Sequence, residues 1–439
     1  MPKQLDRVLI LGGLLVWVVA SILVVVSGQA LAHDEAAFAI GAKRILAGAP
    51  AVMLQRSVGT ELLAVPGTLL GGSEIALRSL FAVVSVSVPL GACALARAAF
   101  PSRNAGGLAV AILACSHPML LQAGQVMSDL PATGALLFAL AILSRELSRE
   151  DGPRWTIVGA APLLVAAFYL RYGSAPAIAS VVVAVLVCYA RQLVRSSVRA
   201  LVLGGVGLAL IAPHLIYALH ATGSPLGVVR ASAESTLYLG PGRGLLTYIS
   251  TNPFLYYGSL VVPVMLVGLV SAWRSREGRC IAIAALGTLI VLGIRSHAQP
   301  RYAFPWVAML VVLGAGWLAS AAKDRAKVVT VVAIAAWFGT LIYVGFVVRH
   351  QRSTREPLVQ LARDIAQDAA GRPCTLTAAR IPVLAFYSGC LAVDWPEADQ
   401  TARDYLVAPT PENASLAPPD VPDRHVTRMA THPGVFIID

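Results

Sequence analysis

The chain has 439 residues, of which 57% are hydrophobic and only 13% are charged, and its formal net charge is +11. Soluble domains usually contain about 25% charged residues, so this composition and a mean hydropathy of +0.72 exclude an ordinary soluble protein. Uncharged apolar stretches recur along the chain, and a helix that crosses a bilayer needs about 20 such residues. The composition therefore predicts an all-α polytopic membrane protein.

Eleven apolar segments are predicted to cross the membrane. They are centred on residues 8–27, 77–96, 105–121, 129–144, 156–170, 174–190, 200–219, 257–273, 281–294, 301–320 and 328–348. The first segment is longer than the apolar part of a signal peptide and has no obvious small-residue cleavage site. We therefore expect it to remain as a transmembrane helix.

Basic residues gather in every second loop. They are Lys3 and Arg7 before the first span, Arg97 and Arg103 after the second, Arg145, Arg149 and Arg154 after the fourth, Arg191, Arg195 and Arg199 after the sixth, Arg274, Arg276 and Arg279 after the eighth, and Lys323, Arg325 and Lys327 after the tenth. This is the positive-inside pattern. It predicts a cytoplasmic N-terminus, an exterior C-terminal segment and no nucleic-acid partner.

The first long exterior connection, residues 28–76, opens with "HDEAAFAIGAKRIL". We expect a helix over 34–48 that lies along the membrane interface, and a second interfacial piece over 57–70 that is broken by Pro66 and Gly67. Asp34 and Glu35 fall in the first turn, where acids are common as helix caps. At a membrane boundary, however, a carboxylate is also a candidate general base for an incoming hydroxyl or amine.

A third acid, Asp129, begins the fourth span in "MSDLPATGALLFAL". Ser128 and Asp129 followed by Pro131 are typical of a helix start. Asp129 is also the only charged residue of its exterior loop, at the expected depth of Asp34. Both interpretations remain open.

Two tight exterior turns contain arginine, which the positive-inside pattern disfavours there. These turns are "FYLRYGSAP", with Arg171, and "IRSHAQPRYAFPW", with Arg295, His297, Arg301 and Tyr302. The planar guanidinium fork suits phosphate oxygens, and we interpret the turns as a site for a phosphate ester. The alternatives are ion pairs with Asp34 and Asp129, or contacts with lipid headgroups.

The tail, residues 349–439, is predicted to form a small exterior α/β domain beside a transmembrane domain of residues 1–348. We expect helices in "EPLVQLARDIAQDAA" and "IPVLAFYSG" and strands in "CTLTA", "LAVDW", "DYLVA" and "GVFIID". Cys374 and Cys390 either form a disulfide or are buried free thiols. The other cysteines, Cys93, Cys115, Cys188 and Cys280, are expected to pack in or beside spans, and none of the six has a metal-ligand spacing.

The ordered set of motifs resembles the GT-C membrane glycosyltransferases that use polyprenyl-phosphate sugars, including the lipid A aminoarabinose transferase and protein O-mannosyltransferase families. The motifs are "HDEAAFAIGAKRILAG", "GGSEIALRSLFAVVS", "MSDLPATGALLFALAIL", "FYLRYGSAPAI", "HAQPRYAFPWVAMLVVL", "VLAFYSGCLAV" and "DYLVAP". Together they cover most of the chain. A Lys-Pro-Pro stretch that many relatives have in the first exterior loop is missing here, and only Arg56 is available to replace its lysine.

The resemblance implies an inverting glycosyltransferase with a polyprenyl-phosphate-sugar donor and a lipid, glycan or protein acceptor. It implies catalytic roles for Asp34, Glu35 and Asp129. The implied phosphate ligands are Arg171, Arg301, Arg295 and Arg56, and the implied substrate contacts are Tyr172, His297 and Tyr302. No cofactor or metal is required, although paired acids could recruit a divalent ion.

The expected location is the inner membrane of a bacterium, with a periplasmic active site and membrane lipids as neighbours. Two other functions fit part of the sequence. One is a transporter or flippase, which the absence of an internal repeat disfavours. The other is an assembly protein whose tail binds partners.

Overall fold

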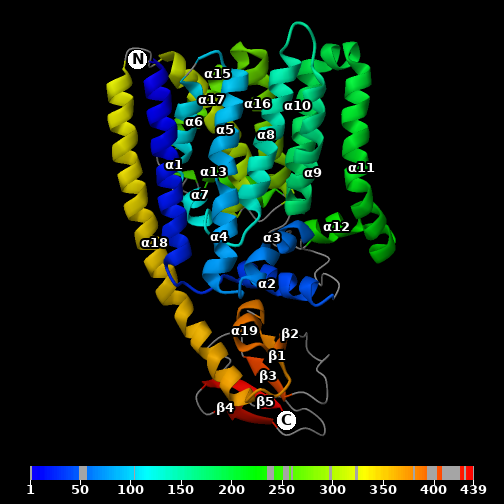
Figure 1. Cartoon of the computed structure of the whole chain (residues 1–439), viewed down its shortest axis with the longest axis vertical. Helices are drawn as coiled ribbons and strands as arrows, with labels where there is room; N and C mark the ends of the chain where they lie inside the picture. Colours follow the sequence, from blue (N-terminus) through cyan, green and yellow to red (C-terminus); the bar gives the residue numbers. More distant parts are fainter. Residues whose placement is uncertain are drawn as a thin grey trace.

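Long helices stand side by side in one bundle, and a smaller region with a β-sheet lies beyond the end of the bundle opposite the N-terminus (Figure 1). The computed structural model describes residues 2–48, 57–102, 104–234, 242–250, 257–258, 261–295, 299–321, 325–378, 381–392, 403–407, 426–429 and 432–438.

The bundle is built from thirteen described α-helices. In chain order they are α1 (Pro2–Val26), α4 (Glu74–Ser85), α5 (Ser87–Ala99), α6 (Ala105–Leu113), α7 (His117–Gln122), α8 (Asp129–Leu147), α9 (Ala160–Leu170), α10 (Ala175–Arg195), α11 (Ser197–Thr222), α15 (Val261–Ser271), α16 (Arg276–Arg295), α17 (Phe304–Ala321) and α18 (Ala326–Ala369). The short 3-10 helices are η1 (Trp155–Gly159), η2 (Tyr172–Ser174), η3 (Ala272–Arg274) and η4 (Pro300–Ala303). Their buried faces share one large hydrophobic core. Side chains such as Val198 and Leu201 of α11 are exposed, which suits contact with lipid chains.

Eight helical stretches in the described part of the chain are long and apolar enough to cross a membrane. All eleven predicted segments contain helix, but three of them do not form a single helix long enough to be counted among these eight. Residues 105–121 form two helices, because α6 ends at Leu113 and α7 begins at His117. Pro118, in the first turn of α7, has no amide hydrogen to donate to the preceding turn, which suits a helix start and prevents α6 from continuing. The other two, Trp155–Leu170 and Val261–Arg274, are shorter apolar helices.

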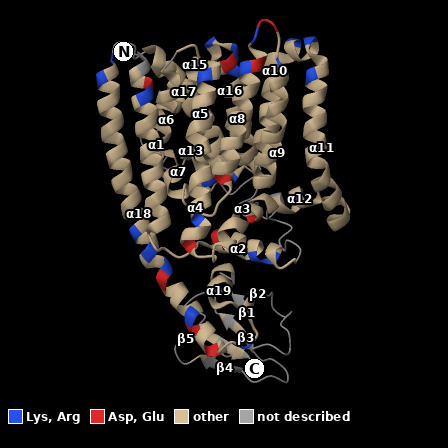
Figure 2. Cartoon of the chain, viewed as in Figure 1, with Lys and Arg blue, Asp and Glu red and all other residues tan. Residues whose placement is uncertain are grey.

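Charged residues mark the two ends of the bundle. Lys and Arg residues gather at the end where the N-terminus lies, and a second set of charged residues lies around α2 (His33–Leu46), α3 (Val58–Leu69) and α4 (Figure 2). The helix lengths between these two sets have few charges. This distribution is the one expected for a protein that spans a bilayer.

Both predicted helices of the first long connection are present. α2 lies across the direction of the long helices at the end of the bundle (Figure 1). The predicted break in the second piece was wrong, because α3 runs without interruption through Pro66 and Gly67. A Cβ atom at residue 67 would lie 2.7 Å from the Leu77 Cα. Glycine is therefore needed for close packing of α3 on α4 and does not end the helix.

Two further short helices are α12 (Gly227–Glu234) and α13 (Arg243–Ser250).

The C-terminal part contains α19 (Ile381–Ser388) and five strands. The strands are β1 (Cys374–Ala378), β2 (Leu391–Ala392), β3 (Arg403–Val407), β4 (Val426–Met429) and β5 (His432–Ile438). The sheet has the order β2-β1-β3-β5-β4, with β1 parallel to β2 and β3 and with β5 antiparallel to β3 and β4. The end of α18 covers the sheet through Ala362, Ile365 and Ala369. Because α18 is continuous across residue 348, the predicted boundary lies inside a helix.

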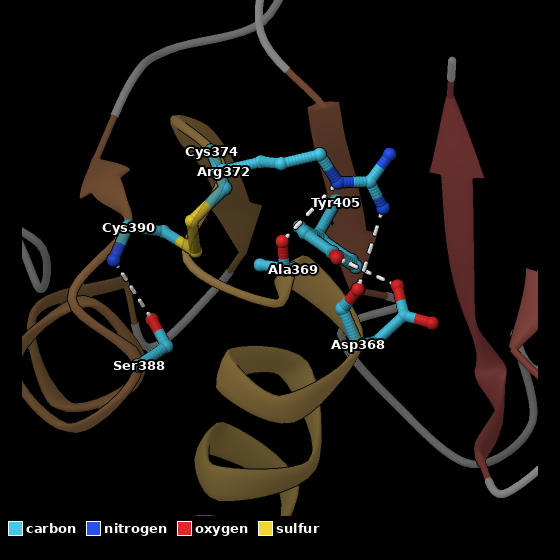
Figure 3. The surroundings of a disulfide bond; sticks show 7 residues. All are labelled: Asp368, Ala369, Arg372, Cys374, Ser388, Cys390 and Tyr405. Carbon is cyan, nitrogen blue, oxygen red and sulfur yellow. Dashed lines mark hydrogen bonds between the residues drawn. A yellow bond between two sulfur atoms is a disulfide. The ribbon is translucent and has the colours of Figure 1, made fainter.

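Cys374 and Cys390 form a disulfide, which decides between the two alternatives left open by the sequence. The bond joins the start of β1 to the residue before β2 (Figure 3). Close to it, the Tyr405 hydroxyl donates a hydrogen bond of 2.7 Å to Asp368 at the end of α18. The disulfide thus links two neighbouring strands, and the Tyr405–Asp368 hydrogen bond ties the sheet to the long helix.

The C-terminal part is docked on the first exterior connection by α19. The Tyr387 hydroxyl donates to Glu74 Oε1 at 2.8 Å and accepts from the Leu31 amide at 2.9 Å. The Lys43 ammonium lies 4.3 Å from the centre of the Phe386 ring. Polar and cation–π contacts thus fix α19 against α2 and the start of α4.

Candidate functional site

An ion pair joins α2 to the start of α17. Arg301 belongs to η4, and its Nη1 donates to Asp34 Oδ2 at 2.6 Å. The two side chains are 18% and 24% exposed, so both keep some access to solvent. This is one of the pairings that the sequence left open for Arg301.

A second ion pair joins Arg171 to Asp129. Asp129 is the first residue of α8 and is buried, and Arg171 is an extended residue between α9 and η2. A Cβ atom at residue 173 would lie 2.9 Å from the Arg171 Nε. Gly173 therefore leaves the space in which the guanidinium lies.

The aromatic ring of Tyr302 brings the two pairs together. Its centre lies 4.4 Å from the Cζ of Arg171 and 5.4 Å from the Cζ of Arg301. Arg171, Arg301, Tyr302 and Asp129 also line one small cavity. The fold thus collects Asp34, Asp129, Arg171, Arg301 and Tyr302 from four distant parts of the sequence.

A wider cavity, of about 400 Å³, also has Arg301 in its lining. Its polar lining consists of His33, Asp34, Gln122, Gln125, Gln299, Arg301, Gln351 and Arg355. The four glutamines and Arg355 were not predicted as site residues. The only signal in the sequence was the presence of amides in exterior segments that are otherwise apolar, such as "LLQAGQVM".

Glu35 lies away from both cavities in a buried ion pair with Arg78. Arg78 donates from Nε to Glu35 Oε1 and from Nη2 to Glu35 Oε2, both at 2.9 Å, and both side chains are fully buried. The Glu35 carboxylate also accepts from the Ala32 amide at 2.8 Å and the Val126 amide at 3.0 Å. Glu35 therefore caps α2 and connects it to α4 and to the segment before Asp129.

Burial alone would raise the pKa of Glu35, but the charge and hydrogen bonds of Arg78, and the charge of Arg355, outweigh this effect. The pKa is consequently held below its ordinary value, and the carboxylate stays ionised. The sequence grouped Glu35 with Asp34 as a catalytic acid. The geometry separates them, because successive residues of a helix point about 100° apart.

The remaining predicted site residues lie elsewhere or outside the described part of the chain. Tyr172, a predicted substrate contact, is buried against Phe168 and His214 and does not line either of the two cavities. Arg295 is the last residue of α16, and its side chain is not described. Arg56 and His297 lie outside the described residues.

Among the residues that the structure describes, there is no cluster of three or more His, Cys, Asp or Glu side chains suited to a metal ion. The described lining of the two cavities includes the ion pairs Asp34–Arg301 and Asp129–Arg171. Such pairs can exchange partners with an anionic ligand, because a guanidinium binds phosphate and carboxylate with the same planar fork.

Comparison with known proteins gives a family model that matches part of the chain and a fold that matches nearly all of it. Residues 58–217 match the model of the dolichyl-phosphate-mannose-protein mannosyltransferase family, and this match includes Asp129 and Arg171. No curated protein matches the chain.

Solved structures match over nearly the whole chain. ArnT from Cupriavidus metallidurans bound to undecaprenyl phosphate has a TM-score of 0.72 at 15% identity, covering 98% of this chain and 97% of that one. An Archaeoglobus fulgidus oligosaccharyltransferase tethered to an acceptor peptide has a TM-score of 0.53 at 14% identity, covering 88% of this chain and 64% of that one. At these identities the likeness shows a common fold.

The family match and the fold confirm the resemblance to GT-C glycosyltransferases that the sequence predicted. The chain is a multi-pass membrane protein, and its enzyme class is glycosyltransferase.

Proposed function

We propose that this glycosyltransferase moves a sugar from a polyprenyl-phosphate donor to a hydroxyl or amine of a lipid, glycan or protein acceptor. The observation that supports this most directly is the meeting of two Asp–Arg pairs at the ring of Tyr302, between two cavities. Two guanidiniums near one point suit a single phosphate group. The carboxylate of Asp34 supplies the base that an acceptor needs.

The arginines and the acids act together in this scheme. A phosphodiester that binds Arg301 competes with Asp34 for the same N–H donors, so donor binding releases the Asp34 carboxylate. Asp34 then takes the proton of the acceptor while the acceptor oxygen or nitrogen bonds to the anomeric carbon. The bond from that carbon to the phosphate oxygen breaks, and the configuration inverts. Arg171 and Arg301 stabilise the negative charge that develops on the leaving polyprenyl phosphate.

We assign the other residues by their positions. Asp129 holds Arg171 in place, and Glu35 is a positioning residue that fixes the start of α2 through Arg78. Arg295 and Arg56 stay candidate phosphate contacts, and His297 a candidate substrate contact, on the sequence argument alone. No cofactor is needed by this chemistry.

We further propose that the end of the bundle with α2 and the sheet faces the exterior, which is the periplasm if the source is a bacterium. The gathering of Lys and Arg at the opposite end supports this orientation (Figure 2). The C-terminal part is then an exterior domain. A periplasm-specific reporter fused after Gly371 should be active, and a cytoplasmic result would contradict the orientation.

The experiment that tests the function is mass spectrometry of envelope glycolipids and glycoproteins. A strain that lacks the gene should lose a glycosylated species. The wild-type chain should restore that species, and an Asp34→Asn chain inserted at the same level should not. Full restoration by Asp34→Asn would contradict the proposed role of the base.

A further inference from the structure

The wide cavity has hydrogen-bonding atoms that no described residue satisfies. The Oε1 atoms of Gln122 and Gln351 and the Nε of Arg301 are buried and have no hydrogen-bond partner among the described residues. All three residues line the cavity. Buried acceptors without a donor are costly, so this lining suits a ligand with hydroxyl groups, each of which can donate and accept.

The charges around the cavity do not suit a cationic ligand. Asp34 is paired with Arg301, and Glu35 behind it is paired with Arg78 and lies 3.6 Å from Arg355. Arg301 and Arg355 both line the cavity, whereas Asp34 is the only carboxylate among its described lining residues. When the donor phosphate is bound to Arg301, Arg355 remains as the positive charge of the cavity lining, and an ammonium group placed beside it would be repelled.

Gln351 and Arg355 lie one turn apart on α18, on the same face of that helix. This face lines the cavity together with α7, which provides Gln122 and contacts α18 through His117 and Tyr343. The guanidinium of Arg355 is held in place because its Nη1 donates to the Ala30 carbonyl at 2.9 Å. Gln122, Gln351 and Arg355 thus form one wall of the cavity. None of them is among the proposed phosphate ligands Arg171 and Arg301.

From this geometry, and resting on the function proposed above, we infer that the wide cavity binds the glycosyl group of the donor and selects an uncharged sugar over an amino sugar. Gln122 and Gln351 accept hydrogen bonds from the sugar hydroxyls. Arg355 repels a sugar that has an ammonium group. The volume of about 400 Å³ is within the range of small-molecule sites.

The test is the binding of three polyprenyl phosphodiesters to the purified full chain in nanodiscs. One has a methyl group in place of the sugar, one has an uncharged pentose, and one has a 4-amino-4-deoxypentose. All three have the same lipid and the same phosphate charge. The uncharged pentose should raise the affinity about tenfold over the methyl ester, and the amino sugar should give no gain or a loss.

Variants assign the effect to the cavity wall. Gln351→Leu and Gln122→Leu should each lower the affinity for the uncharged-pentose ester by roughly threefold to tenfold. The affinity for the methyl ester should stay unchanged. Gln360→Leu, at an exposed position on the same helix, is the matched control. Arg355→Gln should improve amino-sugar binding, whereas Arg355→Lys should keep the discrimination because it keeps the charge.

The outcomes separate the two proposals. If the methyl ester does not bind, the proposed phosphate site is contradicted. If the methyl ester binds but the uncharged sugar adds no affinity, or if the amino sugar binds best, the inference about the cavity is overturned. It is also overturned if the leucine variants lose binding of a glycan acceptor and keep the full gain from the donor sugar.

Discussion

The Arg301 guanidinium and the Asp34 carboxylate are 2.6 Å apart in space and 267 residues apart in the chain. The proposed base is therefore blocked by the proposed phosphate ligand until an anion takes its place. This coupling would prevent Asp34 from acting before the donor is bound.

Asp34→Asn should reduce sugar transfer by about a hundred- to ten-thousandfold, because the amide cannot accept the proton of the acceptor. Donor binding should be kept or improved, since Arg301 loses a competing carboxylate. The measurement is transfer from a polyprenyl-phosphate sugar in nanodiscs, with thermal unfolding as a check of the fold. Near-normal turnover would exclude Asp34 as the base and leave Asp129 as the next carboxylate to test.

Arg171→Ala and Arg301→Ala should each weaken donor binding by about ten- to a hundredfold, because a hydrogen bond to a charged group is worth roughly 1.5–3 kcal/mol. Arg363→Ala, which removes an exposed guanidinium of α18, is the control and should have no effect. Donor affinity is measured with the polyprenyl-phosphate sugar. Unchanged affinity in both variants would mean that these arginines serve only their ion pairs.

Glu35→Gln should destabilise the fold by about 3–5 kcal/mol, because it leaves the buried Arg78 without its counterion. The double variant Glu35→Gln/Arg78→Met should be more stable than Glu35→Gln alone. Thermal or denaturant unfolding of the two single variants and the double variant gives the coupling energy. A stable Glu35→Gln protein that has lost transfer activity would favour a catalytic role for Glu35 over a positioning role.

The same ion pair predicts a dependence of stability on pH. The pKa of Glu35 is lower in the folded chain than in the unfolded chain, where it is about 4.3. The contribution of the pair to stability is therefore fully present at neutral pH and is lost as the pH falls below about 4 through the folded pKa. The melting temperature of the wild type minus that of the double variant should shrink over this range. A difference that stays constant down to pH 3 would contradict the assignment.

Removal of the Cys374–Cys390 bond should loosen the C-terminal sheet. The residues are 16 apart, and closing a loop of this size is worth about 3 kcal/mol. Cys374→Ser/Cys390→Ser should lose protection of the β1 and β3 amides in hydrogen exchange, while the bundle helices keep theirs. Equal protection of the strands in both proteins would show that packing on α18 is sufficient.

The sequence by itself determined the class of the protein and most of the membrane organisation. Apolar segment length and the alternation of basic loops are local properties, and each can be assessed without knowledge of distant contacts. Asp34, Asp129, Arg171 and Arg301 could also be singled out as candidate site residues from their local position. A charged residue at the boundary of an apolar segment is costly, and such residues are often functional. The single span expected over 105–121 missed the break before His117, although Pro118 is itself a local signal for a helix start.

Only the tertiary structure decided which charges meet. Asp34 and Glu35 are adjacent and equivalent in the sequence, yet one faces a cavity and the other is buried against Arg78 from another helix. The wide cavity is likewise lined by residues of α7, of the segment before α17 and of the far half of α18. Burial and ion pairing of this kind depend on contacts between segments hundreds of residues apart, and no local pattern encodes which face of a helix such a contact will cover.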